Sequence, residues 1–364
     1  MRLTILTKVL SHLMSPSQET VERGQTVYTV NELETIHSVN RDDWNGLVER
    51  SPRSSLFHRY EWLDVVETGL GYPPKHLVVK KDDNLIGLLP NFVRSIDLTP
   101  FRRLSSVYPG YAGPLISTDV PETLSLLFET VPDLCNRRTI VHELRANDPD
   151  FLRYHGFLRA RGYVPYRGEC RHRIDLTRDY DEILAEMSDS RQKAIRRGKE
   201  RDHELVEAEL TRENLPRFYR TYVEAMERLD GTVHPRRFFE KLIDIPSRVL
   251  FVSLWIEGEY AGSMLELLDD EQSTLFGLIA TVDEDYYEYD AMELLYDYVL
   301  QWGAESDYET YDFGDSSPDF EDGLFMYKDS FGGQIVPSLI WERGCSPLWR
   351  GVSAARLKYE SYNR

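Results

Sequence analysis

The chain has 364 residues, with 62 Asp or Glu against 43 Lys or Arg and a formal net charge of -19. This excess of acid excludes passive binding of the whole surface to DNA or to an anionic membrane. A hydrophobic content of 41%, including 12% aromatic residues, is enough for sizeable cores, and the length favours two domains over one.

The sequence gives little indication of a targeting segment, a membrane-spanning helix or disulfide bonds. Residues 1–25 lack the apolar centre and cleavage site of a secretory signal, so we expect a disordered leader there. Nowhere does an uncharged apolar stretch approach the 18 residues of a membrane-spanning helix. The cysteines, Cys135, Cys170 and Cys345, are odd in number and far apart. Their pattern argues against a disulfide scaffold and against a metal site, and predicts a reducing cytoplasm.

The first half of the chain alternates helices with strands. A strand is predicted over residues 26–30, followed by two helices over about 41–50 and 56–70. A hairpin (76–80 and 85–93), a Gly/Pro/Tyr loop (108–114), a helix (121–135), a strand (139–144), a helix (148–161) and one long strand (163–176) are expected next.

The second half repeats this plan. A charged helix is predicted over 180–201, then a strand (205–210), two helices (212–228 and 235–243) and three antiparallel strands (249–256, 261–268 and 273–280). A helix (290–304), two strands (310–313 and 334–341) and a last helix within 347–364 complete the chain.

The repeated order predicts two mixed α/β (α+β) domains, with mainly antiparallel sheets flanked by helices. We place the first domain at residues 26–178 and the second at 179–345, with a C-terminal helix or tail over 346–364.

Several segments in order resemble the FemAB-like acyltransferases and their BioF2-like relatives. They are Phe57-His58-Arg59-Tyr60-Glu61-Trp62, Tyr111-Ala112-Gly113-Pro114, Ser190–Arg197, Gly258–Gly262, Asp312-Phe313-Gly314 and Tyr327-Lys328 with Phe331-Gly332. The resemblance spans about residues 50–341. It implies two tandem GNAT-like domains, 26–178 and 179–345.

The resemblance also implies a function. Members transfer amino acids from aminoacyl-tRNA to peptidoglycan precursors, or are described as GNAT or BioF2-like acetyltransferases. The expected enzyme is therefore an N-acyltransferase with acyl-CoA or aminoacyl-tRNA as donor, no metal, and a small-molecule or glycan-precursor amine as acceptor. Where the family's Gly-rich signature would fall, residues 281–290 contain no glycine and several carboxylates, so both donors stay open. A catalytically inactive module that binds a polysaccharide precursor or a protein is the alternative.

Lys328 is the first catalytic candidate. A cation between Tyr327 and Phe331 can stabilise the oxyanion of acyl transfer or the 3′-oxygen leaving group of a tRNA 3′ end. Tyr327 is expected to contact the substrate. The alternative is a surface lysine in an ion pair with Asp315 or Asp329.

Asp312 is the second candidate, as the acceptor of the amine proton. The alternative is architectural: the Asp312 side chain caps a backbone N–H, and Gly314 takes a positive φ in a turn.

A basic helix is the third feature. Residues 191–201 carry six cationic side chains, and Arg191 and Arg196 are our choices for binding phosphate groups of the substrate. The alternative is a solvated helix paired with acidic neighbours.

Tyrosines form the last group. Tyr108 and Tyr111 are candidates for stacking on a sugar or base, and Tyr287 for a general acid. The alternative for all three is half-buried packing.

Only nine of the 43 basic residues are lysines, a bias typical of proteins from salt-loaded cytoplasms. Because salt screens the repulsion between surface carboxylates, we expect the melting temperature to rise from low to molar KCl. A melting temperature that stays constant or falls over this range contradicts the interpretation.

Overall fold

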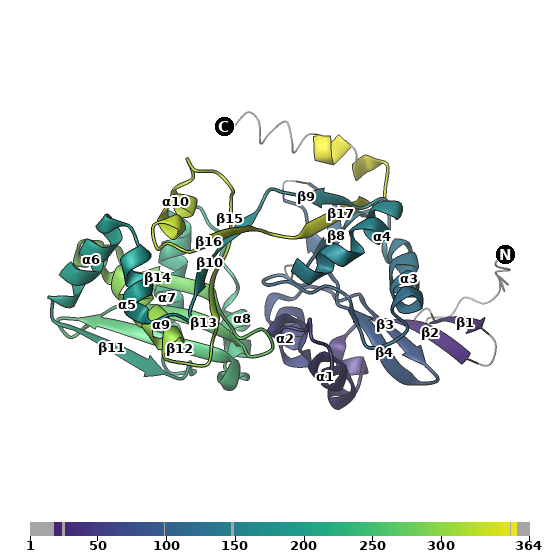
Figure 1. The fold of residues 1–364 in the computed structure, drawn as a ribbon, viewed down its shortest axis with the longest axis horizontal. Coiled ribbons are helices and arrows are strands. Elements are labelled where there is room, and N and C mark those ends of the chain that lie inside the picture. The colour runs from purple at the N-terminus through teal and green to yellow at the C-terminus, as the bar shows by residue number, and fades with distance from the viewer. Residues whose placement is uncertain (1–17, 24–25, 98, 147–148, 350, 355–364) are drawn as a thin grey trace.

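The computed structural model describes residues 18–23, 26–97, 99–146, 149–349 and 351–354. Two lobes lie side by side, with strands passing from one to the other along one edge (Figure 1). None of the described helices is long and apolar enough to cross a membrane.

The N-terminal lobe contains two five-stranded sheets. The strands of the first, in spatial order, are β1 (Gln18–Arg23), β2 (Thr26–Leu33), β3 (His76–Lys81), β4 (Asn84–Leu89) and β7 (Leu115–Ile116). Those of the second are β5 (Phe92–Ser95), β6 (Arg102–Ser105), β8 (Thr139–Arg145), β17 (Ile340–Gly344) and β9 (Val164–Tyr166).

The C-terminal lobe is built on one seven-stranded sheet. Its strands, in spatial order, are β11 (His203–Ala208), β12 (Val249–Ile256), β13 (Glu259–Asp269), β14 (Thr274–Val282), β15 (Thr310–Ser316), β10 (Cys170–Asp175) and β16 (Gln334–Pro337). All neighbouring strands are antiparallel except β14 and β15, which are parallel.

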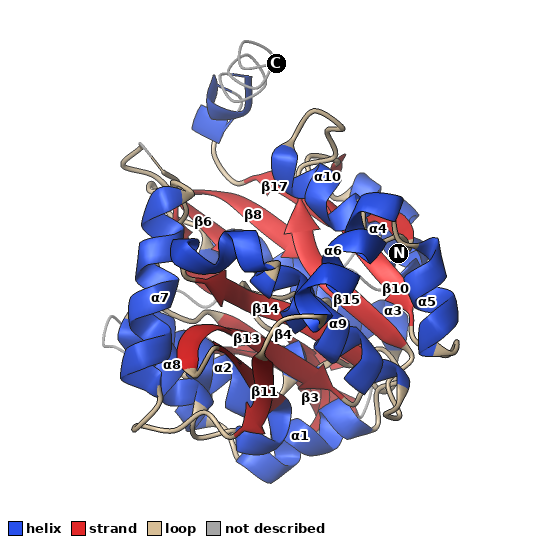
Figure 2. Cartoon of the chain, turned by 90° about the vertical axis from the view of Figure 1, so that its left-hand side faces the viewer, coloured by secondary structure: helices blue, strands red, loops and turns tan. Residues whose placement is uncertain are grey.

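Helices pack against the sheets of both lobes. In the N-terminal lobe they are α1 (Arg41–Glu49), α2 (Tyr60–Asp64), α3 (Val120–Thr130) and α4 (His155–Ala160). In the C-terminal lobe they are α5 (Tyr180–Glu186), α6 (Asp189–Lys199), α7 (Leu215–Arg228), α8 (Arg236–Leu242), α9 (Ala291–Ala304) and α10 (Gly323–Asp329). Figure 2 shows α5, α6 and α9 in front of the seven-stranded sheet.

Local sequence explains where several helices form. Asn40 caps α1 by accepting from the backbone N–H groups of Asp42 and Asp43, whose carboxylates favour the N-terminal end of the helix dipole. In α7 the buried residues Leu215, Phe218, Tyr222 and Ala225 recur every three or four positions, as an amphipathic helix requires.

Two predicted long strands are broken, and the predictions were wrong for the same reason. Residues 163–176 form β9 in the N-terminal lobe and β10 in the C-terminal lobe, and residues 334–341 form β16 and the start of β17 in the opposite direction. In both cases the chain leaves one sheet and enters another. The local sequence pattern cannot show such a crossing, because the sheet that a strand joins depends on its contacts with strands far away in the chain.

The leader and the charged helix also differ from expectation. Residues 18–23 form β1 and pair with β2, whereas the rest of the leader lies outside the described residues. The helix predicted over 180–201 is two helices, α5 and α6, separated at Met187 and Ser188. Helical residues occur at 348–349 and 351–354 of the predicted C-terminal helix or tail.

The domain boundary near residue 178 stays a prediction, and sheet membership does not follow it. Strand β10 precedes that position and belongs to the seven-stranded sheet, while β17 follows it by more than a hundred residues and belongs to the N-terminal lobe. The chain therefore crosses between the lobes more than once.

One apolar core joins the two lobes. It contains Phe57 and Trp62 from the N-terminal lobe together with Phe238 and Phe276 from the C-terminal lobe, all buried. The Phe57 ring lies 5.2 Å from that of Phe276, and the Trp62 ring 6.2 Å from that of Phe238, both edge-to-face. Each phenylalanine removed from water contributes about 2–3 kcal/mol, so the lobes are held as one body.

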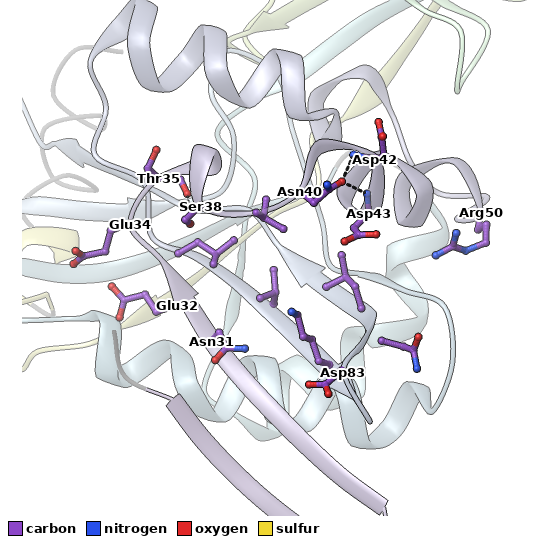
Figure 3. A pocket seen from close by; sticks show the side chains of 16 residues that line it. Asn31, Glu32, Glu34, Thr35, Ser38, Asn40, Asp42, Asp43, Arg50 and Asp83 are labelled. Atoms are coloured by element: carbon purple, nitrogen blue, oxygen red, sulfur yellow. Dashed lines mark hydrogen bonds between the residues drawn. The ribbon is translucent and has the colours of Figure 1, made fainter. Parts of the chain in front are cut away.

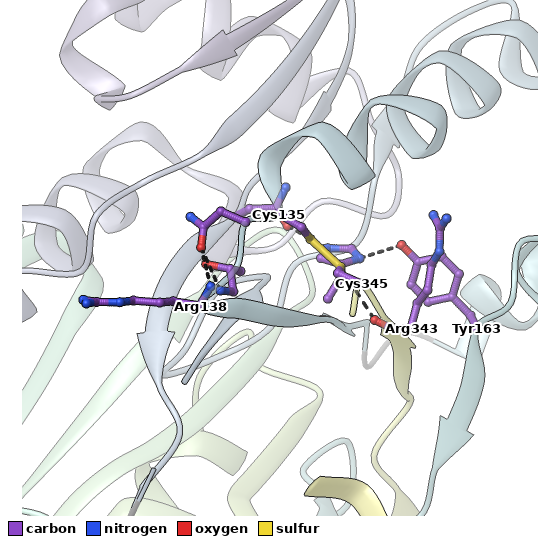
Figure 4. Close-up of a disulfide and its surroundings, with 9 residues drawn as sticks. Cys135, Arg138, Tyr163, Arg343 and Cys345 are labelled. Carbon is purple, nitrogen blue, oxygen red and sulfur yellow. Dashed lines mark hydrogen bonds between the residues drawn. A yellow bond between two sulfur atoms is a disulfide. The ribbon is translucent and has the colours of Figure 1, made fainter. Parts of the chain in front are cut away.

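A disulfide joins Cys135 and Cys345, which the cysteine count had argued against (Figure 4). Their Cα atoms are 6.2 Å apart although 210 residues separate them in sequence. Strand β17 brings Cys345 to the end of the N-terminal lobe, where its N–H donates to the Ile140 carbonyl. Sequence spacing gave no sign of the pairing because the crossing strand creates it.

We expect one reactive thiol per chain when the protein is purified without reductant, denatured and titrated, because Cys170 is the only cysteine outside the bond. Added reductant should raise the count to three. Three thiols before reduction would contradict the disulfide. A Cys170→Ser variant is the control, and its count before reduction should be zero.

Candidate active site

The seven-stranded sheet opens between its two parallel strands. Strands β14 and β15 pair only from Thr274 to Phe276 and from Thr310 to Asp312. Beyond these residues β14 stays with β13 and β15 stays with β10, so the two strands diverge. We call this opening the fork. Backbone groups that face it have no ladder partner across it, and can bind a polar ligand.

Glycines and a buried carboxyl lie at the base of the fork. A Cβ atom on Gly277 would lie 3.0 Å from the Tyr311 hydroxyl and 3.5 Å from Oε2 of Glu266, and one on Gly314 would lie 3.4 Å from the Gly277 carbonyl oxygen. The Tyr311 hydroxyl donates to Oε1 of Glu266 at 3.3 Å, whereas Oε2 has no partner among the described residues. Burial raises the pKa of Glu266 well above its usual value.

Lys328, in α10, contacts β15 just beyond the residues of that strand that pair with β14. Its side chain is buried, and Nζ donates to the carbonyl oxygens of Asp315 at 2.8 Å and Gly314 at 3.2 Å. Burial lowers the pKa of Lys328 to about 8. The alternative of a surface lysine paired with Asp315 or Asp329 was wrong, because the ammonium group contacts backbone carbonyls and lies inside the fold.

Asp312 has the geometry of the architectural alternative. Its Oδ1 accepts the Gly314 N–H at 3.0 Å, and Gly314 has a φ of 73°. Its Oδ2 accepts from Arg171 at 2.6 Å and Arg173 at 3.0 Å. Both carboxylate oxygens of Asp312 are thus engaged in hydrogen bonds within the protein, and this arrangement favours a role in positioning the turn that contacts Lys328.

Arg191 packs against residues 327–331, the segment that contains Lys328. Its guanidinium is 4.3 Å from the centre of the Tyr327 ring and 4.4 Å from that of Phe331, and it donates to Ser330 Oγ at 2.9 Å. It also pairs with Glu293 of α9. The structure therefore brings Arg191, Tyr327 and Lys328 together, with the charge of Arg191 already matched by a carboxylate.

Arg196 lies apart from this group. It is exposed, and its Nε donates to the Gln192 carbonyl of its own helix. Other basic residues of α6 pair with α9: Arg197 with Asp290, and Lys199 with Asp297. For most of the helix this is the arrangement expected of a solvated helix paired with acidic neighbours.

The candidate tyrosines occupy three different places. Tyr111 is buried between the lobes with Arg171 at 4.8 Å from its ring, and burial raises its pKa to about 12. Tyr108 is half-buried beside Arg94 and Arg145. Tyr287 is 49% exposed and contacts Arg228 of α7. No described contact joins Tyr287 to Lys328 or Asp312, so the predicted catalytic trio is not assembled.

Two hollows elsewhere are rich in carboxylates and suit an anionic donor poorly. A cavity of about 740 Å³ in the N-terminal lobe is lined by the carboxylates Glu32, Glu34, Asp42, Asp43 and Asp83 (Figure 3). One of about 430 Å³ beside the turn before α9 includes Asp283, Glu284 and Asp285. A smaller one, about 190 Å³, lies between the lobes and differs from both, because its lining includes Arg53, Arg173 and Tyr111 and no carboxylate. No cluster of described residues has the composition of a metal site.

Sequence reading missed the charged groups between the lobes. Arg145 of β8 donates to Asp315 of β15 at 2.7 Å and to Glu169 at 2.5 Å, and its side chain is 3% exposed. Buried arginines and carboxylates resemble surface residues in a sequence, and only their pairing shows where they lie. The one available signal was their occurrence inside otherwise apolar strands.

Comparison with known proteins supports the observed fold. Residues 187–328 match the acetyltransferase (GNAT) domain family. By sequence, no curated protein matches the chain. The solved structure of FemX is 13% identical with a TM-score of 0.66, covering 86% of this chain and 98% of that one.

Two further structures share the fold. A tandem GNAT protein from the clavulanic acid biosynthesis pathway is 13% identical with a TM-score of 0.50, covering 88% of this chain and 99% of its own. The C-terminal domain of a putative lysylphosphatidylglycerol synthetase from Agrobacterium fabrum is 12% identical with a TM-score of 0.56, covering 85% and 95%. The chain thus has the tandem GNAT fold of FemAB-like acyltransferases, as its motifs predicted.

Glu266 should make stability depend on pH. A carboxyl whose pKa is raised on folding stabilises the protein below its unfolded pKa, and this stability is lost as pH rises through the folded pKa. Between those two values we expect wild-type unfolding free energy to fall by up to about 1.4 kcal/mol per pH unit relative to Glu266→Gln, which cannot ionise.

The measurement is urea unfolding of both proteins from pH 5 to 9. Other buried groups such as Asp269 titrate equally in the two proteins and cancel in the difference. Parallel curves would contradict a raised pKa for Glu266.

Proposed function

We propose that this protein, with its FemAB-like pair of GNAT folds, transfers an acyl or aminoacyl group to an amine at the fork. The observation that supports the proposal is the position of Lys328, a buried cation beside backbone carbonyls where β14 and β15 separate. Few buried lysines lack a carboxylate partner, and such groups gather at functional sites.

The reaction needs no protein nucleophile. The amine nitrogen attacks the acyl carbonyl, an amide C–N bond forms, and the bond from the carbonyl carbon to the leaving oxygen or sulfur breaks. The proton lost by the amine is gained by the leaving group. Backbone N–H groups along the fork and the Lys328 ammonium would stabilise the negative charge on the carbonyl oxygen or on the leaving atom.

The surrounding residues hold this arrangement in place. Asp312 fixes the bend at Gly314, and the bend presents the two carbonyls that bind Nζ of Lys328. Arg191 stacks on Tyr327 and Phe331, which flank the lysine in sequence. We assign Lys328 as the catalytic cation and give Asp312 and Arg191 positioning roles.

For the donor we favour an aminoacyl ester, as on a tRNA 3′ end, over acyl-CoA. In GNAT folds the pyrophosphate of CoA is expected at the helix after the fourth strand, here the start of α9. The turn before that helix carries Asp283, Glu284 and Asp285, and Asp290 precedes its first residue. These carboxylates would repel a pyrophosphate.

For the acceptor we propose the amine of a small molecule or glycan precursor of the cell envelope. The fold shared with FemX and with a putative lysylphosphatidylglycerol synthetase supports this choice.

We place the reaction in the cytoplasm, because aminoacyl-tRNA and acyl-CoA are both made there. The disulfide between Cys135 and Cys345 is of a kind favoured in oxidising compartments.

An inactive binding module is the second candidate. It is favoured by the burial of Lys328, whose ammonium already donates to two carbonyls. Transfer would require the remaining N–H to reach the substrate.

Lys328→Met should lower the rate of acyl transfer by about a hundredfold or more, because an uncharged side chain cannot stabilise the developing negative charge. The assay supplies aminoacyl-tRNA or acetyl-CoA with amine acceptors and follows amide formation. Because two carbonyls lose a donor, stability should fall by about 1–3 kcal/mol, so folding is checked by thermal unfolding.

Lys193→Met, at an exposed position of α6, is the matched control and should retain the wild-type rate. Lys328→Arg keeps the charge and should retain more activity than Lys328→Met. A folded Lys328→Met protein with full activity would remove the lysine from the mechanism. Wild-type protein that binds an acceptor but forms no amide from either donor would favour the inactive module.

A further inference from the structure

Glu266 of β13 is a buried carboxyl group with one unused oxygen. The residue is 1% exposed, and its Oε1 accepts from the Tyr311 hydroxyl at 3.3 Å. Its Oε2 has no hydrogen-bond partner among the residues that the structure describes. Buried polar atoms are nearly always hydrogen-bonded, so an unpartnered one is typical of a place where a ligand atom completes the contact.

Gly277 of β14 leaves this oxygen uncovered. A Cβ atom at position 277 would lie 3.0 Å from the Tyr311 hydroxyl, 3.4 Å from the Asp312 carbonyl oxygen and 3.5 Å from Oε2 of Glu266. Gly277 has no positive φ, so the backbone conformation does not itself require glycine. Three oxygen atoms of β13 and β15 therefore border a space that a larger side chain would fill.

This space lies where the fork closes. Gly277 directly follows Phe276, the last residue of β14 that pairs with β15, and it is half-exposed. The register of β14 against β13 shifts between Leu265 and Glu266, which leaves one extra residue in β14 and bends the strand at this point. A group inserted into the fork would therefore end beside the three oxygen atoms.

Glu266 has no cation near it on its own side of the sheet. The groups that act on its carboxyl are the Tyr311 and Tyr296 hydroxyls, and burial raises the pKa of Glu266 well above its usual value. Arg191 and Glu293 also lie near Tyr296, but they pair with each other. A positive charge brought into the fork would therefore meet a carboxyl group that has no partner for its own charge.

Asp312 and the arginines that bind it belong to the other face of β15. Neighbouring residues of a strand point to opposite faces, so the Asp312 side chain points away from Tyr311. Its carboxylate accepts from Arg171 and Arg173. Only the backbone carbonyl of Asp312 borders the space beside Gly277, so these two guanidinium groups do not neutralise Glu266.

Three oxygen atoms around one space suit a ligand atom that carries several hydrogens. A backbone carbonyl only accepts, and the Tyr311 hydroxyl donates to Glu266 and can still accept. A protonated amino group has three N–H donors and no acceptor, which matches all three oxygens. Its positive charge would also stabilise the ionised form of Glu266, the form that burial disfavours.

We propose that the three oxygens at the base of the fork bind the amino group of the aminoacyl unit that is transferred, and so select an aminoacyl donor over a simple acyl donor. The inference rests on the proposed function for the transfer, and on the contacts around Glu266 for the amino group. Lys328, which binds the Gly314 carbonyl two residues beyond Asp312, is then near the carbonyl end of the same unit.

The bound amino group belongs to the donor and not to the acceptor. An ammonium group held by three oxygens has no lone pair, so it cannot attack a carbonyl carbon. The attacking amine must therefore be a second one, which enters from the open end of the fork. Holding the donor's amino group in its protonated form also prevents one aminoacyl unit from attacking another.

The test is isothermal titration of the full chain with two stable analogues of an aminoacylated 3′ end. They are 3′-deoxy-3′-(L-alanylamino)adenosine and 3′-deoxy-3′-(propionylamino)adenosine, which differ only in the amino group. We expect the wild type to bind the alanyl analogue about tenfold or more tightly, because hydrogen bonds to a charged group are made only by this analogue. Glu266→Gln should remove most of that preference and leave binding of the propionyl analogue nearly unchanged.

Two further variants accompany Glu266→Gln. Tyr311→Phe removes one of the three oxygens and should give a smaller loss of preference. Glu204→Gln is the matched control, because Glu204 is an exposed residue of β11 in the same sheet, and it should keep the wild-type preference. Thermal unfolding confirms that each variant is folded.

The proposal is overturned if neither analogue binds, if the wild type binds both equally, if folded Glu266→Gln keeps the full preference, or if Glu204→Gln loses it equally. Should Glu266→Gln not fold, an unchanged preference in Tyr311→Phe overturns it. Preferential binding through Glu266 without amide formation from aminoacyl-tRNA would contradict the proposed reaction and leave this site standing. Amide formation without any preference for the alanyl analogue would remove this site alone.

Discussion

The contact between the two lobes is the constraint on which the rest of the structure depends. Phe57, from the segment before α2, packs on Phe276 at the last paired residue of β14, and Trp62 packs on Phe238 of α8. Because these side chains belong to one continuous core, the lobes cannot separate without exposing it. The fork begins directly after Phe276, so this core also fixes where the two parallel strands diverge.

A row of buried ion pairs lies beside that core. Without the core, the free-energy cost of burying these charges would not be offset. Arg171 pairs with Asp312, and both side chains are almost fully enclosed; Arg145, equally enclosed, pairs with Asp315, which is 30% exposed. Removing one partner of such a pair leaves an uncompensated charge and costs about 3–5 kcal/mol. The pairs add little net stability, yet they permit few relative positions of β8, β10 and β15. That restriction places the turn of Asp312 and Gly314 where it can hold Lys328.

The two lobes have different roles in the proposed reaction. The C-terminal lobe supplies the fork, the cation Lys328 and the buried carboxyl of Glu266. The N-terminal lobe supplies Arg145, which donates to Asp315 of β15, the residue whose carbonyl accepts from Lys328. Strands that cross between the sheets, and the disulfide at the end of β17, keep these groups in register.

The sequence by itself determined the two-part α/β plan, most helices, the antiparallel strands of the C-terminal lobe and the turn at Asp312 and Gly314, because periodicity and turn chemistry are local. It also drew attention to Lys328 through its motif. Tertiary structure alone decided that residues 163–176 and 334–341 change sheets, that Cys135 meets Cys345, and that Arg191 pairs with Glu293. Each of these depends on contacts between residues far apart in the chain. A local sequence pattern does not show which distant charged group or cysteine will be the partner.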